Sequence, residues 1–466
     1  MTGSQPRAVS GRAAGDELPA PGRRVPGQVL LLAGILFIAI TLRAPLTVVG
    51  PLLGTISRHF GFSGTQAGLL NTLPLLAFAV FSPLAPRIAR SHGIERALLL
   101  AVTALAAGVV VRSLPWAAAL FGGTLALGAA IAVANTLLPA LVKQHFPGRQ
   151  GALTGMYVAT MGVGAAVASG VAVPLAGAAP GGWPTALGCW AGLTIPAAAL
   201  WLPQLRRARG PGLSSQGAPG TTVSGTDGTT QMAAGSTRSP AGGAQRGDGT
   251  RGPGDTAADA PPQRAPQRPA ATAMPWRSPL AWQVTAFMGM QSLGFYVMVG
   301  WLPSILRSHG MSPHAAGWML SFYQVVNLLV SLALPQLIDR LAGQRAIACA
   351  GGLCCASGYL GFILVPGAAT LWVAVAGIGT GCCFVLALSF MALRAQGPGQ
   401  TAALSAMAQS VGYLVAAGGP VAFGFLRDAT GSWTPSLLML LATALALSTA
   451  GLGAGRPAHV APRRRR

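Results

Sequence analysis

One arginine, Arg43, lies inside the first long apolar stretch of the chain, in the sequence Thr41-Leu42-Arg43-Ala44-Pro45-Leu46-Thr47. At 1.5 Å per helical residue it stands roughly 20 Å from the start of that stretch. A charge at such a depth usually faces a cavity, although a long side chain can instead reach the interface. Because Pro45 interrupts the helix beside it, we favour the cavity. A guanidinium there is suited to binding an anion or a planar acceptor.

The acidic residues supply no partner for this arginine. All nine are expected in tails, linkers or loops: Asp16, Glu17, Glu95, Asp227, Asp248, Asp255, Asp259, Asp339 and Asp428. A bound substrate could therefore provide the missing negative charge, and any proton coupling must be indirect. We expect no cofactor and no metal, since the six cysteines stand in apolar runs without histidine nearby and suit small buried side chains.

Uncharged polar side chains are concentrated in the first, second, fourth and fifth apolar runs of each half of the chain. The third and sixth runs are nearly featureless, as expected for helices that face lipid while the others line a central cavity. Gln324, Asn327 and Ser331 share one helical face at i, i+3 and i+7. For each single amide, hydrogen bonding between helices is the alternative role. The predicted substrate-binding residues are Arg43, Asn71, Asn135, Tyr157, Gln291, Tyr296, Gln324, Asn327, Gln409 and Tyr413.

Twelve apolar runs must position these residues, each near the 20 residues that cross a bilayer. They lie near 28–52, 65–86, 95–113, 116–142, 150–176, 183–204, 279–305, 313–337, 344–365, 369–394, 399–426 and 433–453. Runs of this length must be helical, because backbone polar groups cannot stay unpaired in lipid. The expected fold is an all-α membrane protein with twelve transmembrane helices in two six-helix bundles, 28–205 and 278–455.

The segments outside the bundles differ in composition. Residues 206–277 are dominated by Gly, Pro, Ser, Thr, Ala and Arg, which predicts a disordered cytoplasmic linker. Residues 1–27 are predicted to form a disordered cytoplasmic tail without the pattern of a signal peptide, and residues 456–466 a basic cytoplasmic tail.

Charge is scarce and unevenly placed. Charged residues make up 9% of the 466 residues and hydrophobic ones 52%, too few charges to cover a soluble domain. The net charge of +22 would suit nucleic acid, but the basic residues stand in tails and between apolar runs, so we expect no nucleic-acid binding. With both termini cytoplasmic, 26 of the 31 Lys and Arg lie inside; Arg58, Arg112, Arg307 and Arg427 lie outside. This asymmetry predicts a multi-pass protein of the inner (plasma) membrane.

The two halves repeat each other at an offset near 250 residues. Residues 61–68 (GFSGTQAG) reappear as 310–317 (GMSPHAAG), and 148–156 (GRQGALTGM) as 399–407 (GQTAALSAM). Parallel six-helix repeats are the architecture of the major facilitator superfamily.

A loop resemblance supports this reading. Residues 339–345 (DRLAGQR) look like the conserved cytoplasmic loop of that superfamily, whose Asp-Arg pair contributes to gating. This resemblance implies gating roles for Asp339 and Arg340, and for Arg90 at the matching place in the first half, where Ala89 replaces the aspartate. Simple anchoring at the interface is the alternative role of these arginines.

Several further segments resemble the cyanate and 2-nitroimidazole transporter family. They are Leu42-Arg43-Ala44-Pro45 with Val49-Gly50-Pro51-Leu52, residues 135–143 (NTLLPALVK), residues 291–296 (QSLGFY) with Trp301-Leu302-Pro303, and residues 408–414 (AQSVGYL). The resemblance covers both bundles but neither the tails nor the linker. It implies a transporter of small planar solutes such as cyanate or nitroimidazoles.

The sequence therefore favours a monomeric secondary transporter for a small anionic or planar polar solute, working by alternating access. Drug or metabolite efflux on the same scaffold is the main alternative. A membrane sensor would need a folded partner-binding module, which residues 206–277 do not resemble. An enzyme is disfavoured because no nucleophile–base pair or metal cluster is found in the apolar core.

Overall fold

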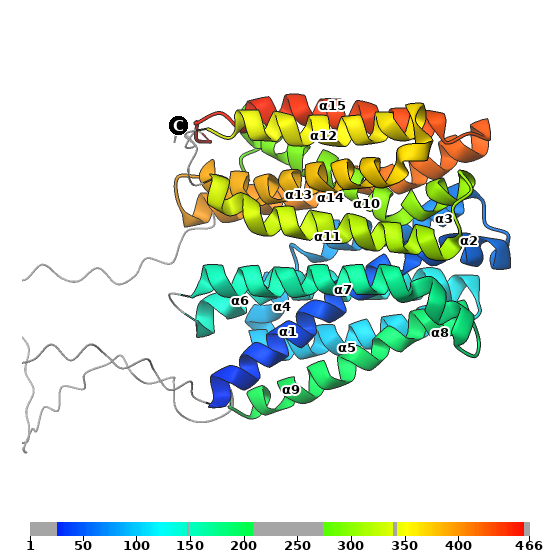
Figure 1. Cartoon of the computed structure of the whole chain (residues 1–466). Coiled ribbons are helices and arrows are strands. Elements are labelled where there is room, and N and C mark those ends of the chain that lie inside the picture. Colours follow the sequence, from blue (N-terminus) through cyan, green and yellow to red (C-terminus); the bar gives the residue numbers. More distant parts are fainter. Residues whose placement is uncertain (1–25, 147–148, 208–273, 339–342, 461–466) are drawn as a thin grey trace, which may run out of the picture. The chain divides into compact units, whose positions relative to one another are not determined.

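A computed structural model describes residues 26–146, 149–207, 274–338 and 343–460 (Figure 1). Its α-helices are α1 (Pro26–Thr47), α2 (Val49–Phe60), α3 (Gly64–Phe81), α4 (Ala85–His92), α5 (Ile94–Arg112), α6 (Ala117–His145), α7 (Gln150–Ala178), α8 (Trp183–Gly188), α9 (Thr194–Arg207), α10 (Pro279–Ser308), α11 (Pro313–Ile338), α12 (Arg345–Leu364), α13 (Ala369–Leu393), α14 (Pro398–Thr430) and α15 (Thr434–Ala454). The 3-10 turns η1 (Cys189–Leu193) and η2 (Pro366–Ala368) join α8 to α9 and precede α13. We name the end of the bundle with Pro26 and Ala454 the terminal end, and the opposite end, with Gly61 and Gly431, the distal end.

The predicted all-α fold with twelve spans is confirmed. Within the described residues, eleven helical segments are long and apolar enough to cross a membrane. The twelfth is α10, which is 30 residues long and packs against α14 and α15. The first span is broken, since α1 ends at Thr47 and α2 begins at Val49. Pro51 explains the break, because it has no N–H to donate to the Thr47 carbonyl one turn earlier.

The repeated segment that opens the second helix of each half has a local structural role. Gly61 and Gly310 both adopt positive φ, 68° and 87°, where glycine avoids the strain of a side chain. Two residues later, Ser63 accepts a hydrogen bond from the Gln66 backbone N–H, and Ser312 accepts one from the Ala315 backbone N–H. The repeat therefore encodes a turn followed by a helix N-cap in both halves.

The last glycine of the same repeat brings the halves together. The second helix of each half packs against the fifth helix of the other, α3 against α14 and α11 against α7. A methyl group on Gly68 would overlap the Pro420 backbone of α14, and one on Gly317 would stand 3.2 Å from the Ser169 carbonyl oxygen of α7. Small residues at these points allow the close helix approach that joins the two halves.

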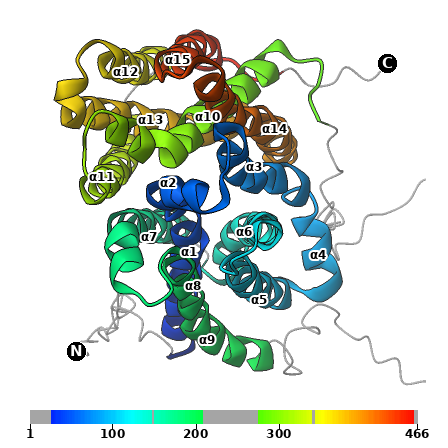
Figure 2. The ribbon, with the colours of Figure 1, turned by 90° about the vertical axis from the view of Figure 1, so that its right-hand side faces the viewer.

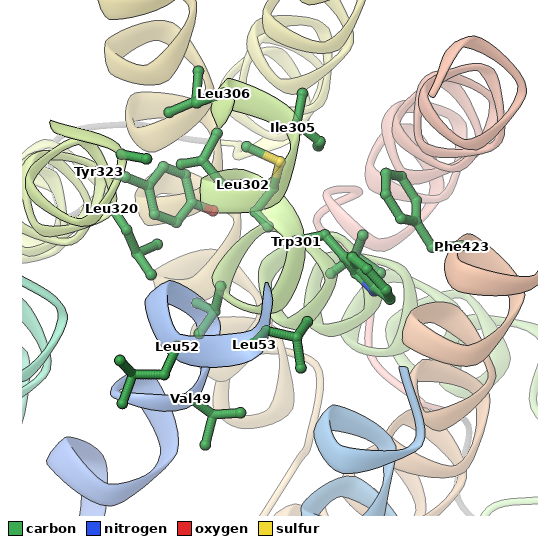
Figure 3. Packing of buried hydrophobic residues seen from close by; sticks show 14 of the residues in the cluster. Val49, Leu52, Leu53, Trp301, Leu302, Ile305, Leu306, Leu320, Tyr323 and Phe423 are labelled. Atoms are coloured by element: carbon green, nitrogen blue, oxygen red, sulfur yellow. The ribbon is translucent and has the colours of Figure 1, made fainter. Parts of the chain in front are cut away.

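The distal side of the interface between the halves is filled by apolar side chains. Helix α2 lies between the two sets of helices, in contact with α7, α10 and α11 (Figure 2). Leu52 and Leu53 of α2 are each 1% exposed and pack in one cluster with Trp301 and Leu302 of α10 (Figure 3). We call this cluster the distal seal.

Alanine at Gly68 tests the close approach. We expect Gly68→Ala to lower the apparent Tm of the purified protein, because relieving such overlap typically costs about 1–3 kcal/mol. Gly418→Ala on α14 is the matched control, since a methyl group there meets no atom within 4 Å while the gain in helix propensity is the same. Equal Tm values for the two variants would contradict this packing role.

Candidate functional site

A cavity lies between the two halves. Its walls come from α1 and α7 of the first half and from α10, α11, α13 and α14 of the second. Six of the ten predicted binding residues line it: Arg43, Gln291, Tyr296, Gln324, Asn327 and Tyr413. The cavity also has an apolar part, formed by Val158, Met161, Leu328 and Phe384 among others.

Arg43 supplies the positive charge of the cavity. It is half-buried near the end of α1, and its Cζ lies 5.1 Å from the centroid of the Phe295 ring. The described part of the chain contains two acidic residues, and both are engaged elsewhere. The Glu95 Oε1 atom is 3.8 Å from His145 Nε2. The Asp428 carboxylate accepts hydrogen bonds from backbone N–H groups at the start of α3. Within the described residues, the Arg43 guanidinium has an aromatic face beside it but no carboxylate in ion-pair range.

Polar atoms on α11 and α10 face the same cavity without a protein partner. The Gln324 and Asn327 amide nitrogens and the Ser331 hydroxyl have no hydrogen-bond partner among the described residues. The side-chain oxygen of Gln291 has no partner either, while the side-chain amide nitrogen of Gln291 donates to the Ser292 hydroxyl at 2.9 Å. A buried polar atom left unpaired costs about 1–3 kcal/mol and requires an explanation. A polar solute in the cavity would satisfy these atoms.

Aromatic rings form one wall of the cavity. Tyr296 and Tyr413 both line it, and both contact Phe78 of α3, with ring centroids at 6.4 and 5.4 Å. Phe295 stands edge-on to Tyr296 at 5.2 Å. Flat ring faces beside a guanidinium are suited to a planar, electron-rich solute.

Four predicted residues lie elsewhere. Asn71 lines a second, smaller cavity that also contains Arg43. Tyr157 is 7% exposed and packs in the apolar cluster of the first half. Asn135 is exposed and Gln409 half-buried, and neither lines these two cavities. Helices that are apolar on every side do not reveal from sequence which face points inward.

Of the predicted gating residues, only Arg90 is described. It is exposed in the last turn of α4. This short helix covers the predicted end of the second span and the loop that follows it. Asp339 and Arg340 lie outside the described residues, as does most of the predicted linker.

The sequence did not single out Arg112 as a site residue and counted it only among the arginines on the outer side of the membrane. The structure places it at the end of α5 but 1% exposed, with Nη1 donating to the Pro45 carbonyl oxygen at 2.6 Å. Its burial corrects the view of the third helix as nearly featureless, while the side of the membrane on which it lies stays a prediction. An arginine that closes an apolar run resembles an interface anchor, so the sequence carried no signal for burial.

Known proteins resemble this chain over most of its length. The model of the Major Facilitator Superfamily matches residues 35–420. A 2-nitroimidazole transporter of Escherichia coli is 40% identical over 93% of this chain and 97% of its own length. The transporter YycB of Bacillus subtilis is 37% identical over 95% of this chain and 98% of its own. The cyanate transport protein CynX of Escherichia coli is more distant, at 22% identity over 86% and 91%.

Among solved structures, the nucleoside transporter NupG aligns with a TM-score of 0.65 and 13% identity, covering 91% of this chain and all of that one. At this identity the likeness supports the fold alone. The predicted resemblance to the cyanate and 2-nitroimidazole transporter family is confirmed by the relatives. The family match over residues 35–420, together with the relatives aligned over nearly their full length, establishes that this chain is a multi-pass membrane transporter belonging to the Major Facilitator Superfamily.

Proposed function

We propose that the protein is a secondary active or facilitative transporter of a small anionic or planar polar solute. The observation that carries the proposal is the Arg43 guanidinium, which lines the cavity between the halves with no described carboxylate in range. An anion or an electron-rich acceptor atom would bind there without breaking an existing ion pair, so no free energy of binding is lost to that step.

The remaining walls support the same solute class. Amide donors on α11 and an acceptor on α10 would bind polar edges, while Tyr296, Tyr413 and Phe295 would cover a flat face. The names of two relatives, a 2-nitroimidazole transporter and a cyanate transport protein, refer to solutes of this kind. A nitro group and a cyanate ion both present electron-rich acceptor atoms to a guanidinium fork.

Alternating access is proposed from the uneven contact between the halves. The distal seal, together with Gly50 of α2 against the Val299 carbonyl of α10, supports a cavity closed at the distal end. Along α7 toward the terminal end, a methyl group on Gly170 would meet Trp318, one on Gly162 would meet Leu328, and one on Gly155 would meet nothing within 4 Å. The contacts of α7 with the second half thus decrease toward the terminal end, which supports access to the cavity from that end. We propose that the terminal end is cytoplasmic, because the basic residues gather there.

Asp428 provides a polar contact that would have to break when the distal end opens. Its carboxylate, on α14, accepts hydrogen bonds from the Gly64 and Thr65 backbone N–H groups at 2.8 and 2.9 Å. It also accepts one from the Thr65 hydroxyl at 3.1 Å. A negative charge at the start of α3 is stabilised by the unpaired N–H groups and dipole of that helix, so Asp428 links the halves in the distally closed state.

Arg43 variants test the solute class. In proteoliposomes, Arg43→Gln should reduce transport of cyanate and 2-nitroimidazole by roughly 10- to 100-fold, the value of one hydrogen bond to a charged group. Arg43→Lys should retain part of the activity, because it keeps the charge and loses the fork. Arg58→Gln, at an exposed arginine of α2, is the control and should transport normally. Full transport by a folded Arg43→Gln protein would refute the assignment.

Asp428 variants test the distal contact. Spin labels at Arg58 and Thr430, in a background without reactive native cysteines, report the distance between the halves at the distal end. Asp428→Ala should enlarge the long-distance population several-fold, because only the closed state loses hydrogen bonds. Glu95→Ala removes the other described carboxylate, near His145, and should leave the distribution unchanged. Identical distributions for Asp428→Ala and the unchanged protein would show that this contact does not bias the equilibrium.

A further inference from the structure

Arg112 is a second guanidinium inside the bundle, and most of it has no partner. Nη1 donates to the Pro45 carbonyl oxygen, but Nε and Nη2 are buried without a hydrogen-bond partner among the described residues. Glu95 lies in the first turn of the same helix, 17 residues earlier and roughly 25 Å away at 1.5 Å per residue. Asp428 is bound to the start of α3. The described protein therefore does not neutralise Arg112.

A second cavity is lined by both Arg112 and Arg43. Its wall includes Arg43 from α1, Asn71 from α3 and Arg112 from α5, and it shares Arg43, Phe295 and Tyr296 with the larger cavity. The Asn71 amide nitrogen, like Arg112 Nε and Nη2, has no partner among the described residues. The fully buried atoms of this wall that lack a partner among the described residues are thus N–H donors, from two different helices.

The two threonine hydroxyls of this wall already have hydrogen-bond partners. The Thr47 hydroxyl donates to the Ala165 carbonyl oxygen at 3.1 Å, and the Thr124 hydroxyl donates to the Leu120 carbonyl oxygen at 2.7 Å. The space itself is narrow, with room for about one water-sized group. A site with two cationic side chains and spare donors, but no described carboxylate, selects a small negatively charged acceptor.

We infer that Arg112 and Asn71, together with Arg43, form an anion subsite beside the main cavity. Its ligand is a single small anionic acceptor, which has two possible sources. One is a halide ion from solution, bound as a counter-ion to the two arginines. The other is the negative end of the transported solute, reaching past Arg43. The inference shares Arg43 with the proposed transport site, but it is tested by anion binding, so failed transport would leave it standing.

Anion-dependent stability is the direct test. The full-length protein is purified in sodium gluconate, whose anion is too large for the site, and gluconate is replaced by chloride or bromide at constant ionic strength. A saturable rise in apparent Tm is expected, because a ligand that binds only the folded state stabilises it by mass action. No rise over gluconate would overturn the inference.

Two variants locate the effect. Arg112→Gln should lose the halide-dependent rise, and Arg58→Gln should keep it. Since Arg112→Gln can fail to fold, Asn71→Asp provides an independent test with a side chain of the same shape. Its carboxylate would supply the missing charge, so the Tm in gluconate should rise and the halide dependence should disappear. A halide response in Asn71→Asp equal to that of the unchanged protein would contradict the proposed site.

Transport kinetics then distinguish the two sources of the anion. A resident halide predicts that solute flux in proteoliposomes falls when chloride is replaced by gluconate. A subsite for the solute's own negative end predicts the reverse, with chloride raising the apparent KM of the solute by competition. Flux and KM that are unchanged by chloride, in a protein that chloride does not stabilise, would count against both.

Discussion

The need to compensate positive charge inside an apolar helix bundle governs this molecule. A buried cation is tolerated only when paired or well hydrogen-bonded, because desolvation otherwise costs several kcal/mol. Arg43 and Arg112 lie in the bundle, while the described carboxylates, Glu95 and Asp428, are at opposite ends of it. One aromatic ring and one carbonyl oxygen provide part of the compensation. We propose that a solute or ion supplies the remainder, which would link the fold directly to anion recognition.

The repeat brings together the helices that surround the cavity. Each half contributes a second helix that begins with a turn glycine and a serine cap and then presents a glycine to the fifth helix of the other half. These paired contacts, α3 with α14 and α11 with α7, place the cavity at the pseudo-symmetric junction. In the proposed alternating access, the two halves would rock about this junction.

The sequence was informative wherever lipid imposes a strict rule. Helical spans follow from apolar length, because backbone polar groups cannot stay unpaired in lipid. The amides of Gln291, Gln324 and Asn327 line the cavity, whereas Asn135 is exposed and Gln409 lines neither cavity. It was uninformative where two environments demand the same residue. Arg112 at a helix end suits both the interface and a buried site, and Asp428 at another helix end suits both a loop and a cap on α3. Tyr157 has an apolar ring and could serve core or cavity, so packing alone decided its place.

The most direct test of the account is whether the purified protein distinguishes charge and electron density in ligands of the same shape. Apparent Tm would be measured against concentration for two matched pairs, benzoate with benzamide and 2-nitroimidazole with imidazole-2-carboxamide. A ligand at 100 times its Kd stabilises the folded state by about 2.7 kcal/mol, which is readily detected. The account predicts that benzoate or 2-nitroimidazole raises the Tm while its partner does not, and that the difference disappears in Arg43→Gln. Equal stabilisation by both members of each pair, or a difference that survives in Arg43→Gln, would contradict it.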